Sequence, residues 1–160
     1  MDSQAGPDAA CRVQEPFQPE ELLDALQAVI GNRLIRDAPA ITERRIANAA
    51  RYDDALANID GIEVPARRPG VRHVFHLYMV RAERRDELLR HLNDAGVEAR
   101  VHYPIPLHLQ EAARDLGYGE GDFPRAERDA KSVITLPAHP YLTPNEIEYV
   151  IDRVRAFYGA

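Results

Sequence analysis

The chain has 160 residues, a formal net charge of −6 and a pI near 5.5, and a domain of this length buries roughly 68–70% of its unfolded surface, enough for one hydrophobic core. A nucleic-acid partner held by phosphate neutralisation needs a basic face, so the acidic balance argues against one. No apolar run reaches transmembrane length and residues 1–10 lack the regions of a signal peptide, so we expect a cytoplasmic protein with no membrane partner.

The first 60 residues predict a leader followed by two helices. Residues 1–15 are small and polar without periodicity, so we expect a disordered leader in which the single Cys11 is incidental. Pro19 suits the first position of a helix, and Gly31 is expected to end that helix. A second, longer helix is expected after Pro39, because apolar residues recur there at intervals of three and four: Ile46, Ala49, Tyr52, Leu56 and Ile59.

Residues 71–160 alternate between strand and helix patterns. Apolar side chains occupy both alternating sets of residues 71–80, which predicts a central strand covered on both faces. The sequence Thr143-Pro-Asn-Glu146 is a capping box and marks the start of the last helix. Between these two elements we expect, in order, a helix at 83–95, a strand at 97–101, a helical stretch at 109–117, a short helix at 125–131 and a strand at 132–136.

These elements predict one domain over residues 16–160, with a helical entry at 16–60 and an α/β core at 71–160. Because the strands and helices would share one core, we expect an α/β sandwich around a small, partly antiparallel sheet. Arginines alternate with acids along the predicted helices, which is typical of solvated helix faces; examples are Arg44, Arg45, Arg84 and Arg85.

The segment Arg100-Val-His-Tyr-Pro-Ile-Pro-Leu-His-Leu-Gln110 gathers the most potential chemistry in the chain. Pro104 and Pro106 each fix their own backbone and hold the residue before them in an extended conformation. We therefore expect a stiff loop, and a stiff loop can hold side chains at fixed distances from a ligand with little loss of binding energy to ordering.

The remaining histidines favour structural roles. In a strand, His73 and His76 would point to opposite faces, so a shared metal ion is not expected. His139 lies between two prolines, where its side chain would cap a turn. A zinc site built from His102, His108 and His139 lacks regular ligand spacing and a paired cysteine, so we expect no metal site.

A series of distinctive stretches runs along the sequence: residues 43–56 and 73–80, the segment Val101–Gln110, and the motifs Asp115-Leu-Gly-Tyr118, Gly121-Asp-Phe-Pro124 and Leu136-Pro-Ala-His-Pro140. Taken in this order, they resemble the C-terminal small domain of the DegT/DnrJ/StrS-type pyridoxal-phosphate-dependent nucleotide-sugar aminotransferases. The resemblance covers about residues 26–160.

The resemblance implies the small domain of an aspartate-aminotransferase-type fold, in an enzyme that moves an amino group from an amino acid to a keto nucleotide-sugar. It also implies that the proline loop lies near the bound sugar. His102, Tyr103 and His108 would then contact substrate by hydrogen bonding or stacking, and Arg100 would meet an anionic part of it. No residue of this chain is implied as catalytic.

The sequence departs from the family pattern in two ways. The large domain, which carries the Schiff-base lysine and most of the phosphate site, is absent, and the single Lys131 does not match the lysine motif. A Gly-x-Asn-x-Arg pattern that usually reaches cofactor or substrate is replaced by Gln18, Glu20 and Leu22. We therefore expect the chain alone to bind no pyridoxal phosphate, and the sequence leaves open whether it takes part in catalysis.

Three interpretations remain open. The chain is the small domain of a sugar aminotransferase, completed by a large-domain partner chain or cut from a longer enzyme, and its surface toward the missing domain is then apolar and exposed. Alternatively, it is a stand-alone, catalytically inactive accessory module that binds a nucleotide-sugar. An independent enzyme that uses the histidines is the third interpretation, and it lacks a recognisable nucleophile, base and orienting group.

Overall fold

The computed structural model describes residues 19–160, with side chains from residue 24 onward. The predicted leader at 1–15, with Cys11, lies outside the described residues. The chain divides into two compact units, Met1–Ala38 and Pro39–Ala160. In residues 19–160, no helix combines the length and the apolar character that crossing a membrane requires.

The described part of the first unit contains helix α1 (Pro19–Leu34) and the 3-10 helix η1 (Ile35–Asp37). The prediction that Gly31 ends the first helix is wrong, since α1 continues for three residues beyond it. A single glycine costs a helix only about 1 kcal/mol, and Arg33 in the last turn pairs with Asp37 at 3.2 Å.

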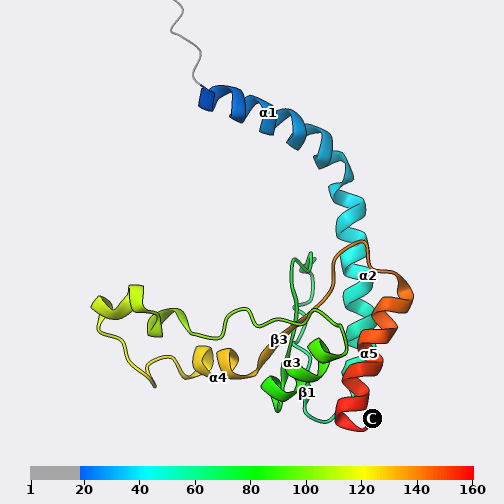
Figure 1. Cartoon of the computed structure of the whole chain (residues 1–160), viewed down its shortest axis with the longest axis vertical. Helices are drawn as coiled ribbons and strands as arrows, with labels where there is room; N and C mark the ends of the chain where they lie inside the picture. Colours follow the sequence, from blue (N-terminus) through cyan, green and yellow to red (C-terminus); the bar gives the residue numbers. More distant parts are fainter. Residues whose placement is uncertain (1–18) are drawn as a thin grey trace, which may run out of the picture. The chain divides into compact units, whose positions relative to one another are not determined.

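The second unit is built on a three-stranded antiparallel sheet (Figure 1). Strand β2 (Tyr78–Ala82) lies in the centre, between β1 (Ile62–Glu63) and β3 (Val133–Leu136). Ile62 is opposite Ala82, and Tyr78 is opposite Leu136. The predicted class, an α/β fold around a small antiparallel sheet with a central strand, is confirmed.

Four α-helices complete the second unit: α2 (Ala38–Leu56), α3 (Arg85–Asp94), α4 (Pro124–Ser132) and α5 (Pro144–Tyr158). Helix α5 begins with the predicted capping box, in which Thr143 and Glu146 bond each other's backbone N–H. Helices α3 and α5 pack against each other, and their apolar faces join the sheet in one core. The largest fully buried side chains are Tyr52, Leu56, Tyr78, Leu88, Leu92, Ile134, Leu136, Ile147 and Ile151.

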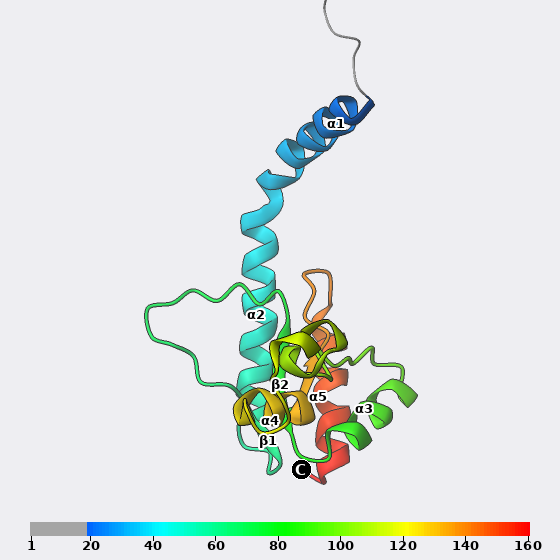
Figure 2. The same ribbon diagram turned by 90° about the vertical axis from the view of Figure 1, so that its left-hand side faces the viewer.

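Two predicted strands differ from the structure. Residues 71–77 lie outside β2 and belong to a loop that extends from the unit beside α2 (Figure 2). Residues 97–101 form only an isolated bridge, between Arg100 and Thr135. The predicted helical stretch at 109–117 consists of two 3-10 helices, η2 (Leu107–Leu109) and η3 (Glu111–Leu116).

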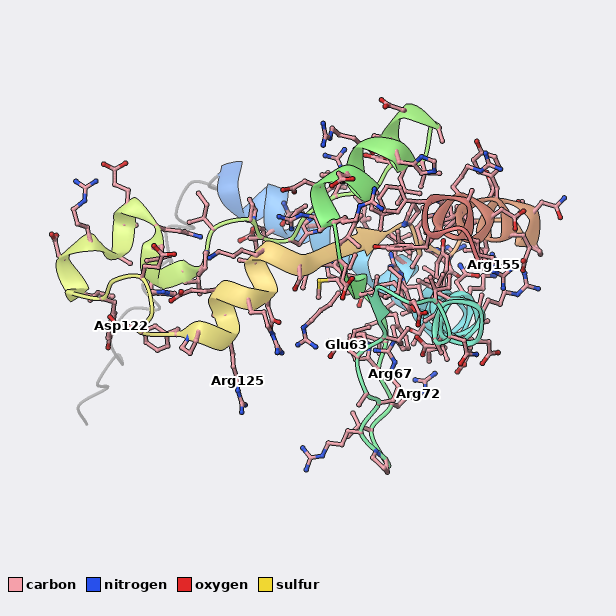
Figure 3. The ribbon with its side chains drawn as sticks, turned by 90° about the horizontal axis from the view of Figure 1, so that it is seen from below. Glu63, Arg67, Arg72, Asp122, Arg125 and Arg155 are labelled. Carbon is pink, nitrogen blue, oxygen red and sulfur yellow. The ribbon has the colours of Figure 1, made fainter. Side chains whose placement is uncertain are left out.

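Side-chain contacts from α2 hold the 64–77 loop and explain why it does not extend the strand. Arg45 Nη1 donates to the carbonyl oxygens of Phe75 (3.1 Å) and His76 (3.0 Å), so these groups do not pair with a neighbouring strand. Arg67 forms a two-pronged ion pair with Asp53 on α2, with distances of 2.6 and 3.0 Å. Figure 3 shows Arg67 and Arg72 at the base of this loop.

Replacing Gly61 by alanine is expected to lower the free energy of unfolding by about 1–3 kcal/mol. Gly61 has φ +92°, and a Cβ there would lie 2.7 Å from a ring carbon of Tyr158. Gly96 also has a positive φ but open space around it, so Gly96→Ala should cost about 1 kcal/mol or less. Urea unfolding of the two variants measures the difference, and equal losses would show that the Tyr158 contact is unimportant.

Candidate functional site

The structure divides the four predicted substrate-binding residues between different places. Arg100 and His102 line one pocket of about 170 Å³ at the end of β3, which we call the His102 pocket. Tyr103 and His108 lie outside it, farther along the chain. The other lining residues include Arg45, His76, Glu98, Thr135, Pro137 and His139.

The His102 pocket gathers polar groups from four separate segments of the chain. His102 Nδ1 lies 2.9 Å from Thr135 Oγ1, so the ring is held against β3. Arg100 pairs with Glu98, and this hydrogen bond is the main reason that the pKa of Glu98 lies below its usual value. With two guanidinium groups, three imidazole rings and one carboxylate, the pocket favours an anionic or hydroxyl-rich ligand.

His108 has a different environment from His102. Its Nε2 donates to Glu127 Oε1 on α4 at 3.0 Å, and both side chains are at most 10% exposed. The same oxygen accepts hydrogen bonds from the backbone N–H of Gly121 (2.8 Å) and Phe123 (3.3 Å). The His108 ring also packs on Phe123, with centroids 4.8 Å apart. These contacts attach the 103–123 segment to α4.

Acidification is expected to release this attachment. The hydrogen bond from Gly121 is the largest cause of a lowered Glu127 pKa, with His108 and Phe123 adding to it. A carboxyl with a lowered folded-state pKa stabilises the fold above its unfolded pKa of about 4.3, and that contribution disappears as the pH falls through the folded value. The amide NMR signals of Gly121 and Phe123 should therefore shift together below about pH 4.

Substitution of Glu127 by glutamine should produce the same amide shifts at neutral pH. Glu120→Gln is the matched control, because Glu120 is exposed and pairs only loosely with Lys131 at 3.6 Å. If both variants leave the two amides unchanged, Glu127 does not hold the segment.

The 103–123 segment presents an apolar surface. The side chains of Tyr103 and Leu107 are 70% and 78% exposed. In Figure 1 the segment extends away from the sheet beyond α4. The other large apolar side chains exposed on it are Ile105, Leu109, Leu116, Tyr118 and Phe123.

His73 and His139 have local backbone partners. His73 Nδ1 accepts from the backbone N–H of Phe75 at 2.9 Å, and His139 Nδ1 accepts from that of Tyr141 at 3.3 Å. These contacts agree with structural roles for both rings, but His73 lies in a loop and not in the predicted strand, and His139 also lines the His102 pocket. In the part of the chain that the structure describes, no group of three or more His, Cys, Asp or Glu could hold a metal ion.

The single lysine, Lys131, does not have the setting that an imine with pyridoxal phosphate requires. An imine-forming lysine needs a buried or electropositive setting. The side chain of Lys131 is 74% exposed and lies beside Glu120.

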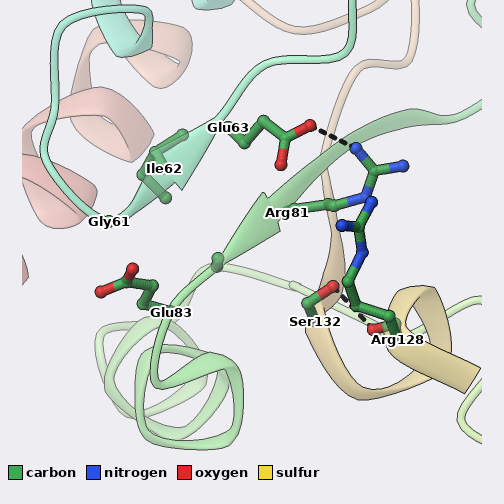
Figure 4. A pocket seen from close by; sticks show the side chains of 8 residues that line it. Gly61, Ile62, Glu63, Arg81, Glu83, Arg128 and Ser132 are labelled. Carbon is green, nitrogen blue, oxygen red and sulfur yellow. Dashed lines mark hydrogen bonds and ion pairs between the residues drawn. The ribbon is translucent and has the colours of Figure 1, made fainter. Parts of the chain in front are cut away.

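A larger pocket of about 310 Å³ lies between β1, the end of β2 and α4 (Figure 4). It contains Arg81, Arg128, Glu63 and Glu83. Arg81 is already neutralised by Glu63 and by Asp129, to which its Nε donates at 2.7 Å. The balanced charges of this pocket give no preference for a ligand of either sign. None of the predicted site residues lines the pocket.

Comparison with known proteins gives the context of these sites. Residues 20–155 match the model of the DegT/DnrJ/EryC1/StrS aminotransferase family. The chain is 41% identical over 133 residues to dTDP-3-amino-3,4,6-trideoxy-alpha-D-glucose transaminase of Streptomyces venezuelae. This match covers 83% of the chain and 35% of the relative. It is 40% identical over 134 residues to the erythromycin biosynthesis sensory transduction protein EryC1 of Saccharopolyspora erythraea, covering 84% of this chain and 37% of that one.

Solved structures agree with the sequence matches. The crystal structure of S. venezuelae DesV in complex with a ketimine intermediate superposes with a TM-score of 0.81 at 39% identity, covering 84% of this chain and 36% of DesV. The PLP-form of Spr1654 from Streptococcus pneumoniae superposes with a TM-score of 0.76 at 28% identity, and the match covers 84% of this chain and 36% of Spr1654. The chain spans little more than a third of the length of these relatives. It belongs to the DegT/DnrJ/EryC1/StrS aminotransferase family of pyridoxal-phosphate-dependent sugar aminotransferases.

Proposed function

We propose that this chain supplies the small domain of an enzyme that transfers an amino group from an amino acid to a keto nucleotide-sugar, and that a large domain must complete it. The observation that carries the proposal is the apolar surface of residues 103–123, which lies outside a core that is already closed. Exposed apolar surfaces of this kind are typical of interaction sites. The large domain would supply the cofactor and its lysine.

In this proposal, the proline loop contributes substrate contacts and no catalytic group. Arg100 and His102 would donate hydrogen bonds to the nucleotide-sugar in the His102 pocket, and Tyr103 would contact it from the exposed side of the loop. His108 has its Nε2 engaged by Glu127, so its contribution would be to position the loop and to contact ligand with the rest of its ring.

The test is complementation. The chain is mixed with a lysine-bearing large-domain fragment of the S. venezuelae transaminase, and glutamate-dependent amino transfer to a keto nucleotide-sugar is measured. We expect activity in the mixture and none in either part. Absence of both binding and activity at micromolar concentrations of the two parts would overturn the proposal.

A variant with Ile105→Asp and Leu107→Asp tests the apolar surface. Burial of such a side chain contributes about 1.5–3 kcal/mol, so the pair should weaken association at least tenfold. Arg90→Asp is the control, because Arg90 is exposed on α3, outside the 103–123 segment. Equal association of all three proteins would exclude this surface as the docking site.

A stand-alone accessory module that binds a nucleotide-sugar is the second candidate. It is favoured by the His102 pocket, whose lining comes entirely from residues 45–139 of this chain and needs no partner. Isothermal titration calorimetry of UDP-glucose into the chain alone distinguishes the small domain of an enzyme from the accessory module. Binding that His102→Ala removes, together with failed complementation, would favour the accessory module.

A further inference from the structure

The largest cavity that we describe, about 480 Å³, lies between α2 and the loop that leads into α5. We call it the α2 groove. One wall is formed by Arg44, Asn48 and Arg51, and the other includes Pro140, Tyr141 and Pro144. None of these residues lines the His102 pocket.

The helix geometry places the two arginines on one face. Arg44, Asn48 and Arg51 are spaced by four and then three residues, which puts their side chains in a single stripe along α2. The two arginine backbones are about 10 Å apart along the axis, at 1.5 Å per residue. Two long side chains at this spacing can converge on one ligand that carries more than one anionic group.

The charge of the groove is positive. No acidic residue lines it, although the chain has 26 Asp and Glu residues and a net charge of −6. Two of the three acids of α2 are used elsewhere: Glu43 pairs with Arg72, and Asp53 pairs with Arg67. The third, Asp54, does not line the groove. Within residues 39–160, neither Arg44 nor Arg51 forms an ion pair.

The opposite wall is rigid and presents an aromatic ring. Asn48 Nδ2 donates to the carbonyl oxygen of His139 at 3.0 Å, and the Tyr52 hydroxyl donates to that of Pro137 at 2.9 Å, so α2 fixes this loop. His139 Nδ1 accepts from the N–H of Tyr141. The ring of Tyr141 is nevertheless 74% exposed, and an exposed ring on a fixed backbone is a platform on which a planar group can stack.

We infer that the α2 groove binds a nucleoside diphosphate, with its phosphates on Arg44 and Arg51 and its base stacked on Tyr141. The guanidinium fork matches phosphate oxygens in a bidentate geometry. The ligand would be a free nucleotide or the nucleotide part of a larger ester, and both have the same recognition chemistry. This site does not depend on a large-domain partner.

The test is calorimetric titration of the chain alone with UDP, UDP-glucose and inorganic pyrophosphate. Binding of UDP is expected, and the double variant Arg44→Ala/Arg51→Ala should weaken the binding of UDP and of pyrophosphate at least tenfold. Tyr141→Ala should weaken the binding of UDP about tenfold and leave the binding of pyrophosphate unchanged, since only the base stacks on the ring. UDP-glucose binding as tightly as UDP would identify the nucleotide part of an ester as the ligand, and much weaker binding would identify the free nucleotide.

Two controls keep the inference falsifiable. Arg125→Ala/Arg128→Ala removes the same charge from α4 and should leave UDP binding unchanged. Arg90→Ala should also leave it unchanged, because Arg90 is exposed on α3 and does not line the groove. The inference is overturned if UDP does not bind at millimolar concentration, or if either control variant loses as much affinity for UDP as the double variant Arg44→Ala/Arg51→Ala.

Discussion

Replacing Arg85 by alanine is expected to lower the free energy of unfolding by about 2–5 kcal/mol, because two carbonyl groups would lose a charged donor. The side chain of Arg85 is 9% exposed. Its Nη1 donates to the carbonyl oxygens of Ala130 (3.1 Å) and Val133 (2.9 Å), where α4 ends and β3 begins. Arg85 therefore joins α3 to the junction that sets the position of β3. Urea unfolding followed by circular dichroism measures the loss.

The neighbouring Arg84 offers a matched control. Its side chain is 56% exposed and pairs with Glu87 one helical turn away. Exposed pairs of this kind contribute little to stability, so Arg84→Ala should leave the unfolding curve nearly unchanged. If the two variants lose the same amount, the hydrogen bonds to Ala130 and Val133 are unimportant.

Replacing Leu92 by alanine is expected to cost about 2–5 kcal/mol, which is the usual range for a leucine removed from a packed core. Leu92 is fully buried. It belongs to α3, which packs against α5. The cost combines the lost burial of the side chain with the cavity that rigid neighbours leave open.

Leu89 of the same helix is only partly buried and packs at the margin of the core, so Leu89→Ala should cost less than Leu92→Ala. Thermal and urea unfolding of both variants give the comparison. A loss at position 89 equal to that at position 92 would show that α3 is not oriented as described.

The elements that follow from local patterns could be predicted from the sequence. Helix α5 has its capping box and apolar stripe, and α3, α4 and β3 begin and end close to their expected residues. Strand β1 could not be predicted, because two residues carry no periodicity. The strand expected from residue 71 is shortened by contacts from α2, which are 30 residues away in sequence.

The contacts of two arginines also could not be predicted from the sequence. A solvated helix face was expected for Arg45 and Arg85, but Arg45 binds the backbone of the 64–77 loop and Arg85 is buried at the end of α4. The alternation of charges along a helix indicates which residues face one side, and it does not show which distant carbonyl group lies there. Tertiary contacts decided both cases.

The candidate site could be located from the sequence only in part. The proline loop and its resemblance to the family indicated four substrate contacts, of which the structure brings Arg100 and His102 together in one pocket; their role toward substrate stays a prediction. The partner of His108 could not be predicted, because Glu127 lies 19 residues later and is brought to it by the folding of the whole 103–123 segment. The only local sequence signal for the role of Glu127 is its place near the start of α4, where the preceding backbone N–H groups need an acceptor.

The edges of the sheet determine how this chain can associate with another. Strand β1 is two residues long, and at the other edge both backbone groups of Thr135 are bonded to Arg100, at 2.8 and 3.1 Å. Unpaired edge groups are what a foreign strand uses to extend a sheet or to start a fibril. The sheet therefore offers almost no template for strand addition, and association through this unit must depend on side chains.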